Sequence, residues 1–142
     1  MKVFSWNIRG SGSTTKRRAI EEVICKANPD IVVLQETKKE VVDKRLVGSI
    51  WRSCFKDWIT LPSIGRAGVI LIVWDVRRVK VINTLLGDFS VSILVEGDGE
   101  TNWWFTGVYG PYSYNSRDNF WDELAGLWSL CGDRWYLGGD FN

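Results

Sequence analysis

Three short apolar runs in the sequence are each followed by polar residues whose side chains carry oxygen atoms. Residues 3–6 precede Asn7, residues 31–34 precede Gln35 and Glu36, and residues 135–137 precede the segment that ends in Asp140 and Asn142. The chain of 142 residues has no histidine and no CxxC pair. Hard oxygen donors without imidazole or thiolate suit Mg²⁺ or Mn²⁺ rather than zinc. The sequence therefore predicts a hard-cation site that includes Glu36 and Asp140.

A cation held by carboxylates is suited to chemistry on phosphate esters. Such chemistry needs a metal to neutralise phosphate charge, a carboxylate to activate water, and donors that hold the anionic oxygens. The absence of histidine excludes, within this chain, every mechanism that uses imidazole as acid, base or ligand. Glu36 or Asp140 alone is an ordinary residue for a turn after a strand. Their joint position argues for a site.

The elements that must position these residues alternate between strand and helix. Apolar spacing predicts helices at residues 16–27, 41–46 and 116–130, the first ended by Asn28-Pro29. In the last helix the pattern places Phe120, Leu124, Leu127 and Trp128 on one face. Residues 31–34 form a continuous apolar run, which is typical of a strand buried on both faces. Strands are predicted at residues 3–6, 31–34, 58–61, 68–74, 79–86, 90–96, 103–108 and 135–137.

Helices that flank a mixed set of strands predict an α/β or α+β layered sandwich. Glycine, aspartate and asparagine turns, such as Gly97-Asp98-Gly99, indicate antiparallel hairpins in the middle of the chain. Ligand sites in such folds lie beyond the carboxyl ends of strands, so we expect Asn7, Glu36 and Asp140 around one crevice. No repeat or linker interrupts the chain, which predicts a single domain over residues 1–142.

Composition limits the possible partners and locations. The net charge of +1 gives no global argument for a polyanion, so any contact with DNA must rest on local groups such as Lys16-Arg17-Arg18. No apolar run approaches the roughly 18 residues of a membrane span, and the N-terminus is unlike a secretory signal. We expect an intracellular protein, nuclear or cytoplasmic, that is neither secreted nor inserted in a membrane. The three cysteines are expected to be reduced core thiols, and most of the nine tryptophans to be core residues.

Four motifs follow one another along nearly the whole chain. They are SWNIRG at residues 5–10, PDIVVLQETK at 29–38, VYGP at 108–111 and GGDFN at 138–142. In that order they resemble the first four motifs of the endonuclease/exonuclease/phosphatase family. The residues of these motifs are most similar to those of the endonuclease domain of plant LINE-type (non-LTR) retrotransposons, in the apurinic-endonuclease-like branch. The resemblance implies a magnesium-dependent phosphodiester hydrolase that acts on DNA.

The resemblance also implies a role for each matching residue. Glu36 corresponds to the principal magnesium ligand, and Asn7 to the asparagine that helps to hold the metal-bound phosphate site. Tyr109 corresponds to the tyrosine that contacts the scissile phosphate. Asp140 corresponds to the residue that orients or deprotonates the attacking water, and Asn142 to the residue that positions that group.

Arg9 and Lys38 are weaker candidates for contact with a substrate phosphate. Arg9 stands where DNA-repair members of the family carry an acidic residue, which is in keeping with the retrotransposon branch. A phosphate contact and a solvated surface role are both open for it. Lys38 follows Glu36 closely enough to meet nucleic acid at the rim of the crevice. Ser11 occupies a place where the family pattern leads us to expect an apolar residue.

The resemblance implies further elements that these 142 residues do not contain. Family members continue past the GDFN motif with more strands, a late aspartate and a closing Ser-Asp-His segment. We therefore expect residues 1–142 to be the N-terminal portion of such a domain, with negligible hydrolytic activity alone. Two alternatives remain open. One is a phosphatase of the same family acting on phosphoinositides or another phosphoester, and the other is a non-catalytic fragment that binds metal or nucleic acid.

Overall fold

The computed structural model describes residues 1–38, 42–61, 70–99 and 101–142. The elements in chain order are β1 (Val3–Asn7), α1 (Thr14–Ala27), β2 (Ile31–Gln35), α2 (Lys44–Ile50), β3 (Lys56–Leu61), β4 (Ile70–Asp75), β5 (Val81–Leu86), β6 (Ser90–Val95), β7 (Trp103–Tyr109), η1 (Tyr114–Ser116), α3 (Arg117–Cys131) and β8 (Trp135–Asp140). Each predicted helix and strand has a counterpart among these elements.

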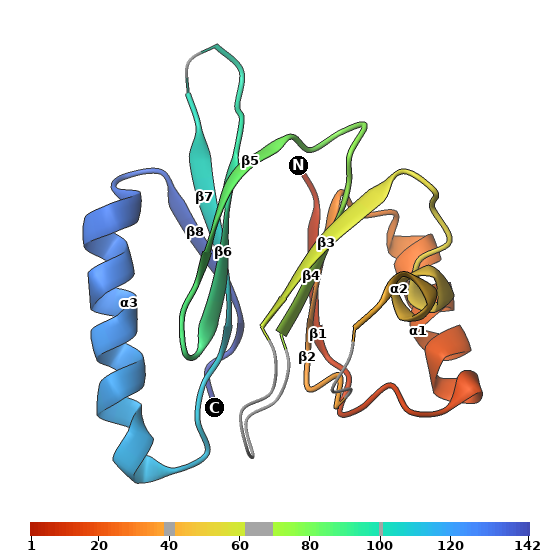
Figure 1. Ribbon diagram of the computed structural model, residues 1–142, viewed down its shortest axis with the longest axis horizontal. Helices are drawn as coiled ribbons and strands as arrows, with labels where there is room; N and C mark the ends of the chain where they lie inside the picture. The colour runs from red at the N-terminus through yellow and green to blue at the C-terminus, as the bar shows by residue number, and fades with distance from the viewer. Residues whose placement is uncertain (39–41, 62–69, 100) are drawn as a thin grey trace.

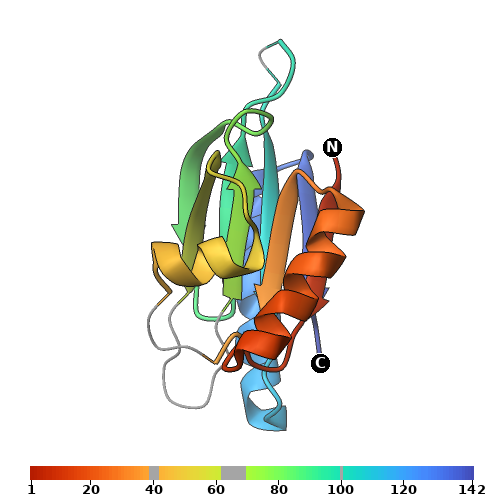
Figure 2. The same cartoon turned by 90° about the vertical axis from the view of Figure 1, so that its right-hand side faces the viewer.

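The strands form two sheets that pack face to face (Figure 1). Sheet A has the strand order β1-β2-β4-β3, and sheet B has the order β5-β6-β7-β8. Helix α3 covers the outer face of sheet B, and α1 and α2 lie side by side over the outer face of sheet A (Figure 2). The fold is therefore the layered sandwich of two mixed sheets flanked by helices that the sequence predicted.

Each sheet contains one parallel pair of strands joined by a helix. β1 and β2 are parallel, with Asn7 opposite Gln35, and α1 connects them. β7 and β8 are parallel, with Tyr109 opposite Asp140, and α3 lies on the connection. The other pairs are antiparallel and include the hairpin β3-β4 and the meander β5-β6-β7. The hairpins expected in the middle of the chain are thus confirmed.

Strand β2 is buried along its whole length, which accounts for its continuous apolar run. Ile31 and Val33 point into the core between the two sheets. Val32 and Leu34 point to the opposite side, into the core shared with α1 and α2. Because both faces are covered, no position in this strand except its last residue, Gln35, carries a polar side chain. The predicted double-sided burial is confirmed.

Helix α2 lies further along the chain than the sequence predicted. The prediction covered residues 41–46, of which residue 41 lies outside the described residues. The helix begins after Asp43, whose side chain accepts a hydrogen bond from the backbone N–H of Leu46 at 2.8 Å. A capping aspartate satisfies an N–H group that has no partner inside the helix. Leu46, Val47 and Ile50 then form the buried face of α2.

Helix α3 packs on sheet B through Phe120, Leu124, Leu127 and Cys131. The prediction that Trp128 shares this face is wrong, because its side chain is 71% exposed. A stripe that runs through residues 120, 124, 127 and 131 leaves residue 128 on the flank of the helix, beyond the edge of the contact with the sheet. Cys131 takes the buried place instead.

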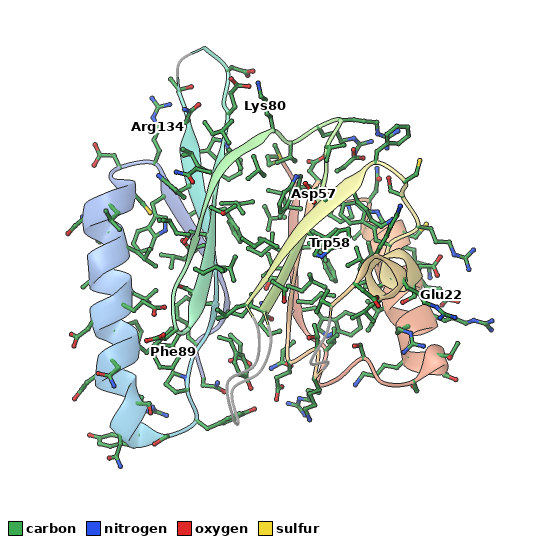
Figure 3. All side chains as sticks on the ribbon, in the orientation of Figure 1. Glu22, Asp57, Trp58, Lys80, Phe89 and Arg134 are labelled. Carbon is green, nitrogen blue, oxygen red and sulfur yellow. The ribbon has the colours of Figure 1, made fainter. Side chains whose placement is uncertain are left out.

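Glu123 ties α3 to the turn between β5 and β6. Its carboxylate accepts hydrogen bonds from the backbone N–H of Asp88 at 2.6 Å, that of Phe89 at 3.0 Å and the hydroxyl of Ser90 at 2.7 Å. Phe89 itself lies between sheet B and α3 (Figure 3). One side chain of the helix thus satisfies three donors of the turn.

Gly107 in β7 allows the two sheets to approach closely. A Cβ atom at this position would lie 2.9 Å from Cγ1 of Val33 and 3.3 Å from Cδ1 of Ile72, both in sheet A. Such a contact is too close for the side chain of any other residue to fit unless its neighbours in sheet A shift. The absence of a side chain at residue 107 therefore helps to set the spacing of the sandwich.

The expectations for cysteines and tryptophans hold only in part. Cys25 and Cys54 are exposed and Cys131 is buried, so the prediction of three core thiols is wrong for two of them. Cys25 is on the outward side of α1, and Cys54 is in the turn before β3. Six tryptophans are buried or pack partly buried on the cores, whereas Trp6, Trp121 and Trp128 are exposed.

No helix in the described part of the chain has the length and apolar character needed to span a membrane.

Candidate functional site

The two sheets meet at the carboxyl ends of β1 and β8. Asn7 is the last residue of β1 in sheet A, and Asp140 is the last residue of β8 in sheet B. The side-chain amide of Asn7 donates a hydrogen bond from Nδ2 to Oδ2 of Asp140 at 2.7 Å. Two residues that the sequence placed at separate strand ends are therefore in direct contact. The strand β8 is longer than predicted and runs through Gly138 and Gly139 to Asp140, so the carboxylate is held by the sheet.

The end of the chain folds back on Asp140. The backbone N–H of Asn142 donates to Oδ1 of Asp140 at 2.9 Å, and the side-chain amide of Asn142 donates to the carbonyl of Gly110. The N–H of Gly110 in turn donates to the backbone carbonyl of Asp140 at 2.7 Å. Each carboxylate oxygen of Asp140 thus accepts one hydrogen bond, which fixes the orientation of the group.

Glu36 lies one residue beyond β2 and is 8% exposed. Its Oε1 accepts a long hydrogen bond of 3.4 Å from the hydroxyl of Tyr112. The ring of Tyr112 packs edge to face against the ring of Tyr109, with a centroid distance of 6.2 Å. Glu36 and these two tyrosines therefore form a second group at this end of the sandwich, one carboxylate with two phenols.

Tyr109 is buried and remains a neutral phenol. Burial raises the pKa of Tyr109 far above its ordinary value, and hydrogen bonding with Tyr112 and Glu36 and the negative charge of Glu36 raise it further. Loss of the phenol proton would create a second negative charge beside Glu36 in a poorly solvated place. Tyr109 is therefore available as a hydrogen-bond donor and not as a base.

The oxygen donors of this region suit a hard cation. Among the described residues, the ion pairs involve neither Glu36 nor Asp140. A nearly buried carboxylate such as Glu36 gains from a positive partner. In the described ranges no group of three acidic, histidine or cysteine side chains is close enough to enclose a metal by itself.

The loops that leave β1 and β2 are hydrogen-bonded to each other. The N–H of Gly10 donates to the carbonyl of Glu36, and that of Ser11 donates to the carbonyl of Thr37 at 3.1 Å. The hydroxyl of Ser11 also donates to the Thr37 carbonyl at 2.9 Å. Ser11 is buried, as an apolar residue at this position would be. Its hydroxyl has a hydrogen-bond partner, which allows a serine to stand where an apolar residue was expected.

Arg9 and Lys38 lie on these loops with exposed side chains. The backbone N–H of Arg9 donates to Oδ1 of Asn7 at 3.1 Å, which fixes the other end of the Asn7 amide. Lys16 and Arg17 at the start of α1 donate to the carbonyls of Arg9 and Ser11 and so help to hold the first loop. Lys39 lies outside the described residues. The side chains of Arg9 and Lys38 are exposed, and their contact with a substrate phosphate stays a prediction.

Two residues near the site were not singled out from the sequence. Tyr112 reaches Glu36, and its place directly after the Gly110-Pro111 turn was the available signal. Arg117 donates from Nη2 to the carbonyl of Asn142 at 3.5 Å, a contact that only the folded chain reveals. Lys80 and Arg134 are at the opposite end of the sandwich from the C-terminus (Figure 3).

These features define a class of protein: a two-sheet α/β sandwich in which carboxylates and amides from the ends of its parallel strands meet between the sheets. The model of the Endonuclease/Exonuclease/phosphatase family matches residues 4–142, and the chain belongs to this family. The resemblance seen in the sequence is thereby confirmed. A comparison with curated protein sequences gives no match.

Solved structures of similar fold include an AP endonuclease and the endonuclease domain of a retrotransposon. A humanized D. rerio TDP2 with 14 mutations shares 16% identity and a TM-score of 0.74, over 100% of this chain and 62% of that one. An AP endonuclease from Archaeoglobus fulgidus shares 16% identity and a TM-score of 0.74, over 99% of this chain and 57% of that one. The endonuclease domain of TRAS1, a telomere-specific non-LTR retrotransposon, shares 14% identity and a TM-score of 0.70, over 98% of this chain and 57% of that one. The chain thus shares their fold and spans roughly three fifths of their length.

Proposed function

We propose that this chain contributes the metal-binding and water-activating residues of a Mg²⁺- or Mn²⁺-dependent phosphodiester hydrolase that cleaves DNA, of the LINE endonuclease type. The observation that carries the proposal is the contact between Asn7 of sheet A and Asp140 of sheet B, with Glu36 at the end of the strand next to β1. Family membership supports hydrolysis of a phosphoester. The AP endonuclease and the TRAS1 endonuclease domain among the similar structures support DNA as the substrate.

Each residue of the site has a chemical role in this proposal. Glu36 is the carboxylate that would hold the cation, with Asn7 beside it. A bound cation would neutralise phosphate charge and favour attack at phosphorus. Asp140 is the group that orients and deprotonates water, because each of its oxygens has one hydrogen bond and keeps acceptor capacity for a water molecule. Tyr109 donates a hydrogen bond to a phosphate oxygen, and Asn142 holds the loop that orients Asp140.

Metal affinity is the first test of this proposal, because the 142-residue chain lacks the histidine that the family resemblance implies and should hydrolyse DNA negligibly. Binding of Mn²⁺ to the purified chain is measured by electron paramagnetic resonance, for the wild type, Glu36→Gln and Glu22→Gln. Glu22 is an exposed carboxylate on α1 (Figure 3), so Glu22→Gln is the matched control. We expect Glu36→Gln to weaken binding about tenfold or more, since it removes the charged ligand. Equal affinities in all three proteins would refute the proposed site.

The substrate class is tested with the same proteins. Binding of a DNA oligonucleotide and of phosphoinositide vesicles is compared in the presence of Mn²⁺. Stronger, metal-dependent binding of DNA supports a nuclease, and preference for phosphoinositide would favour the phosphatase alternative. Metal-dependent nicking of plasmid DNA by the wild type that is absent in Asp140→Asn would contradict the expected lack of activity.

A further inference from the structure

An exposed aromatic pair lies directly beside the candidate catalytic residues. Phe141 stands between Asp140 and Asn142 in the chain and is 42% exposed, and Trp121 on α3 is 54% exposed. Their rings are stacked, with centroids 6.5 Å apart and an angle of 18° between the planes. Large aromatic side chains exposed as a contiguous group are typical of a binding surface rather than of a solvated one.

A buried ring packs against both members of the pair. Phe120 is fully buried and contacts Trp121 at a centroid distance of 5.1 Å and Phe141 at 6.1 Å. Phe89 packs on the other side of Phe120 at 5.7 Å. Because both exposed rings are anchored in this way, a ligand that stacks on them loses little affinity to the ordering of side chains.

The cation Arg117 contacts both the residue after Phe141 and a further aromatic ring. Arg117 places its guanidinium 5.9 Å from the ring centre of Tyr114 and donates to the carbonyl of Asn142. Tyr114 and Tyr112 are both exposed, and Tyr112 reaches Glu36. Arg117, one turn before Trp121 on α3, therefore connects the chain segment that carries Phe141 to the ring of Tyr114.

This combination of features is absent from the other exposed tryptophan of α3. Trp128 lies two turns after Trp121 on the same helix, is 71% exposed and stacks on no other ring in the described part of the chain. Exposure alone therefore does not distinguish Trp121; its stacking on Phe141, the residue that follows Asp140 in the chain, does. Aromatic faces beside a phosphate site are the arrangement by which proteins hold the bases of single-stranded nucleic acid.

We propose that Trp121 and Phe141 form a stacking platform for an unpaired nucleobase adjacent to the scissile phosphate, with Arg117 facing the phosphodiester backbone. The proposal rests on the proposed function and names its substrate form: a strand with an unstacked base at the cleavage position. Phe141 follows Asp140 in the chain, so a base on its ring belongs to the nucleotide at the attacked phosphate or to its neighbour.

The test is the affinity for fluorescein-labelled single-stranded oligonucleotides, measured by fluorescence anisotropy in Mn²⁺ at constant salt. One probe is oligothymidine, and a second has the same backbone with abasic spacers in place of the bases. For oligothymidine we expect Trp121→Ala to weaken binding about 5- to 150-fold, the equivalent of one lost stacking contact. Trp121→Tyr keeps a ring and should restore most of the affinity, whereas Trp128→Ala should bind as the wild type does.

The abasic probe distinguishes stacking from other effects. Wild type and Trp121→Ala should bind it equally, since neither has a base to stack on. The proposal is overturned if Trp121→Ala loses no affinity for oligothymidine, loses the same factor on both probes, or is matched by Trp128→Ala. Failure of the proposed function would look different: Mn²⁺ affinity would be insensitive to Glu36→Gln while the base-dependent effect of Trp121 persisted.

Discussion

The amide of Asn7 makes two hydrogen bonds that require an asparagine. Its Nδ2 donates to Asp140, and its Oδ1 accepts from the backbone N–H of Arg9. The two bonds define which end of the amide carries nitrogen. A carboxylate at residue 7 would lack the donor and would face the negative charge of Asp140. The asparagine thus brings an oxygen donor to the site without a further like charge.

Asp75, at the end of β4, gives the pH dependence of stability a specific origin. Its buried carboxylate accepts hydrogen bonds from Nη2 of Arg77 at 2.8 Å and from Nε at 3.1 Å. The hydrogen bonds from Arg77 hold the pKa of Asp75 below its ordinary value of 3.8, although burial opposes this. Because the folded-state pKa is the lower one, the pair stabilises the fold above about pH 4, and this contribution is lost as the pH falls through the lowered pKa.

We expect Asp75→Asn to lower the free energy of unfolding near pH 7 and to flatten its dependence on pH in the acid range. The neutral amide cannot take up the proton that destabilises the wild type. Urea denaturation followed by circular dichroism at a series of pH values between about 2 and 7 measures both effects. If the free energy of unfolding falls as steeply with decreasing pH in the variant as in the wild type, other carboxylates cause the loss of stability in acid.

At the scale of elements, Glu123 is the main polar link between α3 and sheet B. Glu123→Ala leaves the N–H groups of Asp88 and Phe89 and the hydroxyl of Ser90 without their acceptor. We expect a loss of about 1–3 kcal/mol in the free energy of unfolding, measured by urea denaturation. The neighbouring exposed residue gives the control: Asp122→Ala should change stability by less than about 0.5 kcal/mol. Similar losses in both variants would contradict the assigned role.

The sequence was sufficient to predict which elements exist. The helix α1 ends at Asn28 as expected, and the structure shows this residue in a left-handed conformation. The apolar run of β2 correctly indicated burial on both faces. Boundaries were less predictable where tertiary contacts decide them. β8 continues through Gly138 and Gly139 because both pair with β7, although glycine by itself disfavours a strand. The start of α2 depended on the cap at Asp43, which apolar periodicity does not reveal.

The site was predictable in its residue types and not in its contacts. Asn7 and Asp140 were expected in one crevice, but their hydrogen bond depends on how two sheets are aligned, which local pattern does not specify. The contact of Tyr112 with Glu36 and the stacking of Trp121 on Phe141 were not expected, because such contacts are properties of the folded chain. The roles of these residues in catalysis and binding stay predictions until the variants are measured.

At the scale of the whole molecule, two edge strands lie on the same side of the sandwich in the described part of the chain. β1 ends sheet A and β8 ends sheet B, and the contact of Asn7 with Asp140 places these edges next to each other. Exposed apolar side chains along them include Val3, Tyr136 and Leu137. Unpaired edges with apolar residues promote association between chains.

We therefore expect the isolated chain to associate as its concentration rises. Leu137→Lys places a charge on the β8 edge and should shift the population towards monomer, because a charged edge resists pairing with another strand. Sedimentation velocity over a range of concentrations measures this. Leu130→Lys changes an exposed leucine on α3, away from the edge, and should have little effect. A wild type that is monomeric throughout the range would disprove the prediction.

The close approach of the sheets at Gly107 has a consequence for the order in which the molecule acquires function. Asn7 and Glu36 belong to sheet A, while Tyr109 and Asp140 belong to sheet B. A folding intermediate with only one sheet formed contains half of the donors and has no site. Ligand binding is then coupled to docking of the sheets, so any ligand that bridges them stabilises the docked state over the separated one. Gly107 is therefore needed for ligand binding because it permits the sheets to dock, although it contacts no ligand itself.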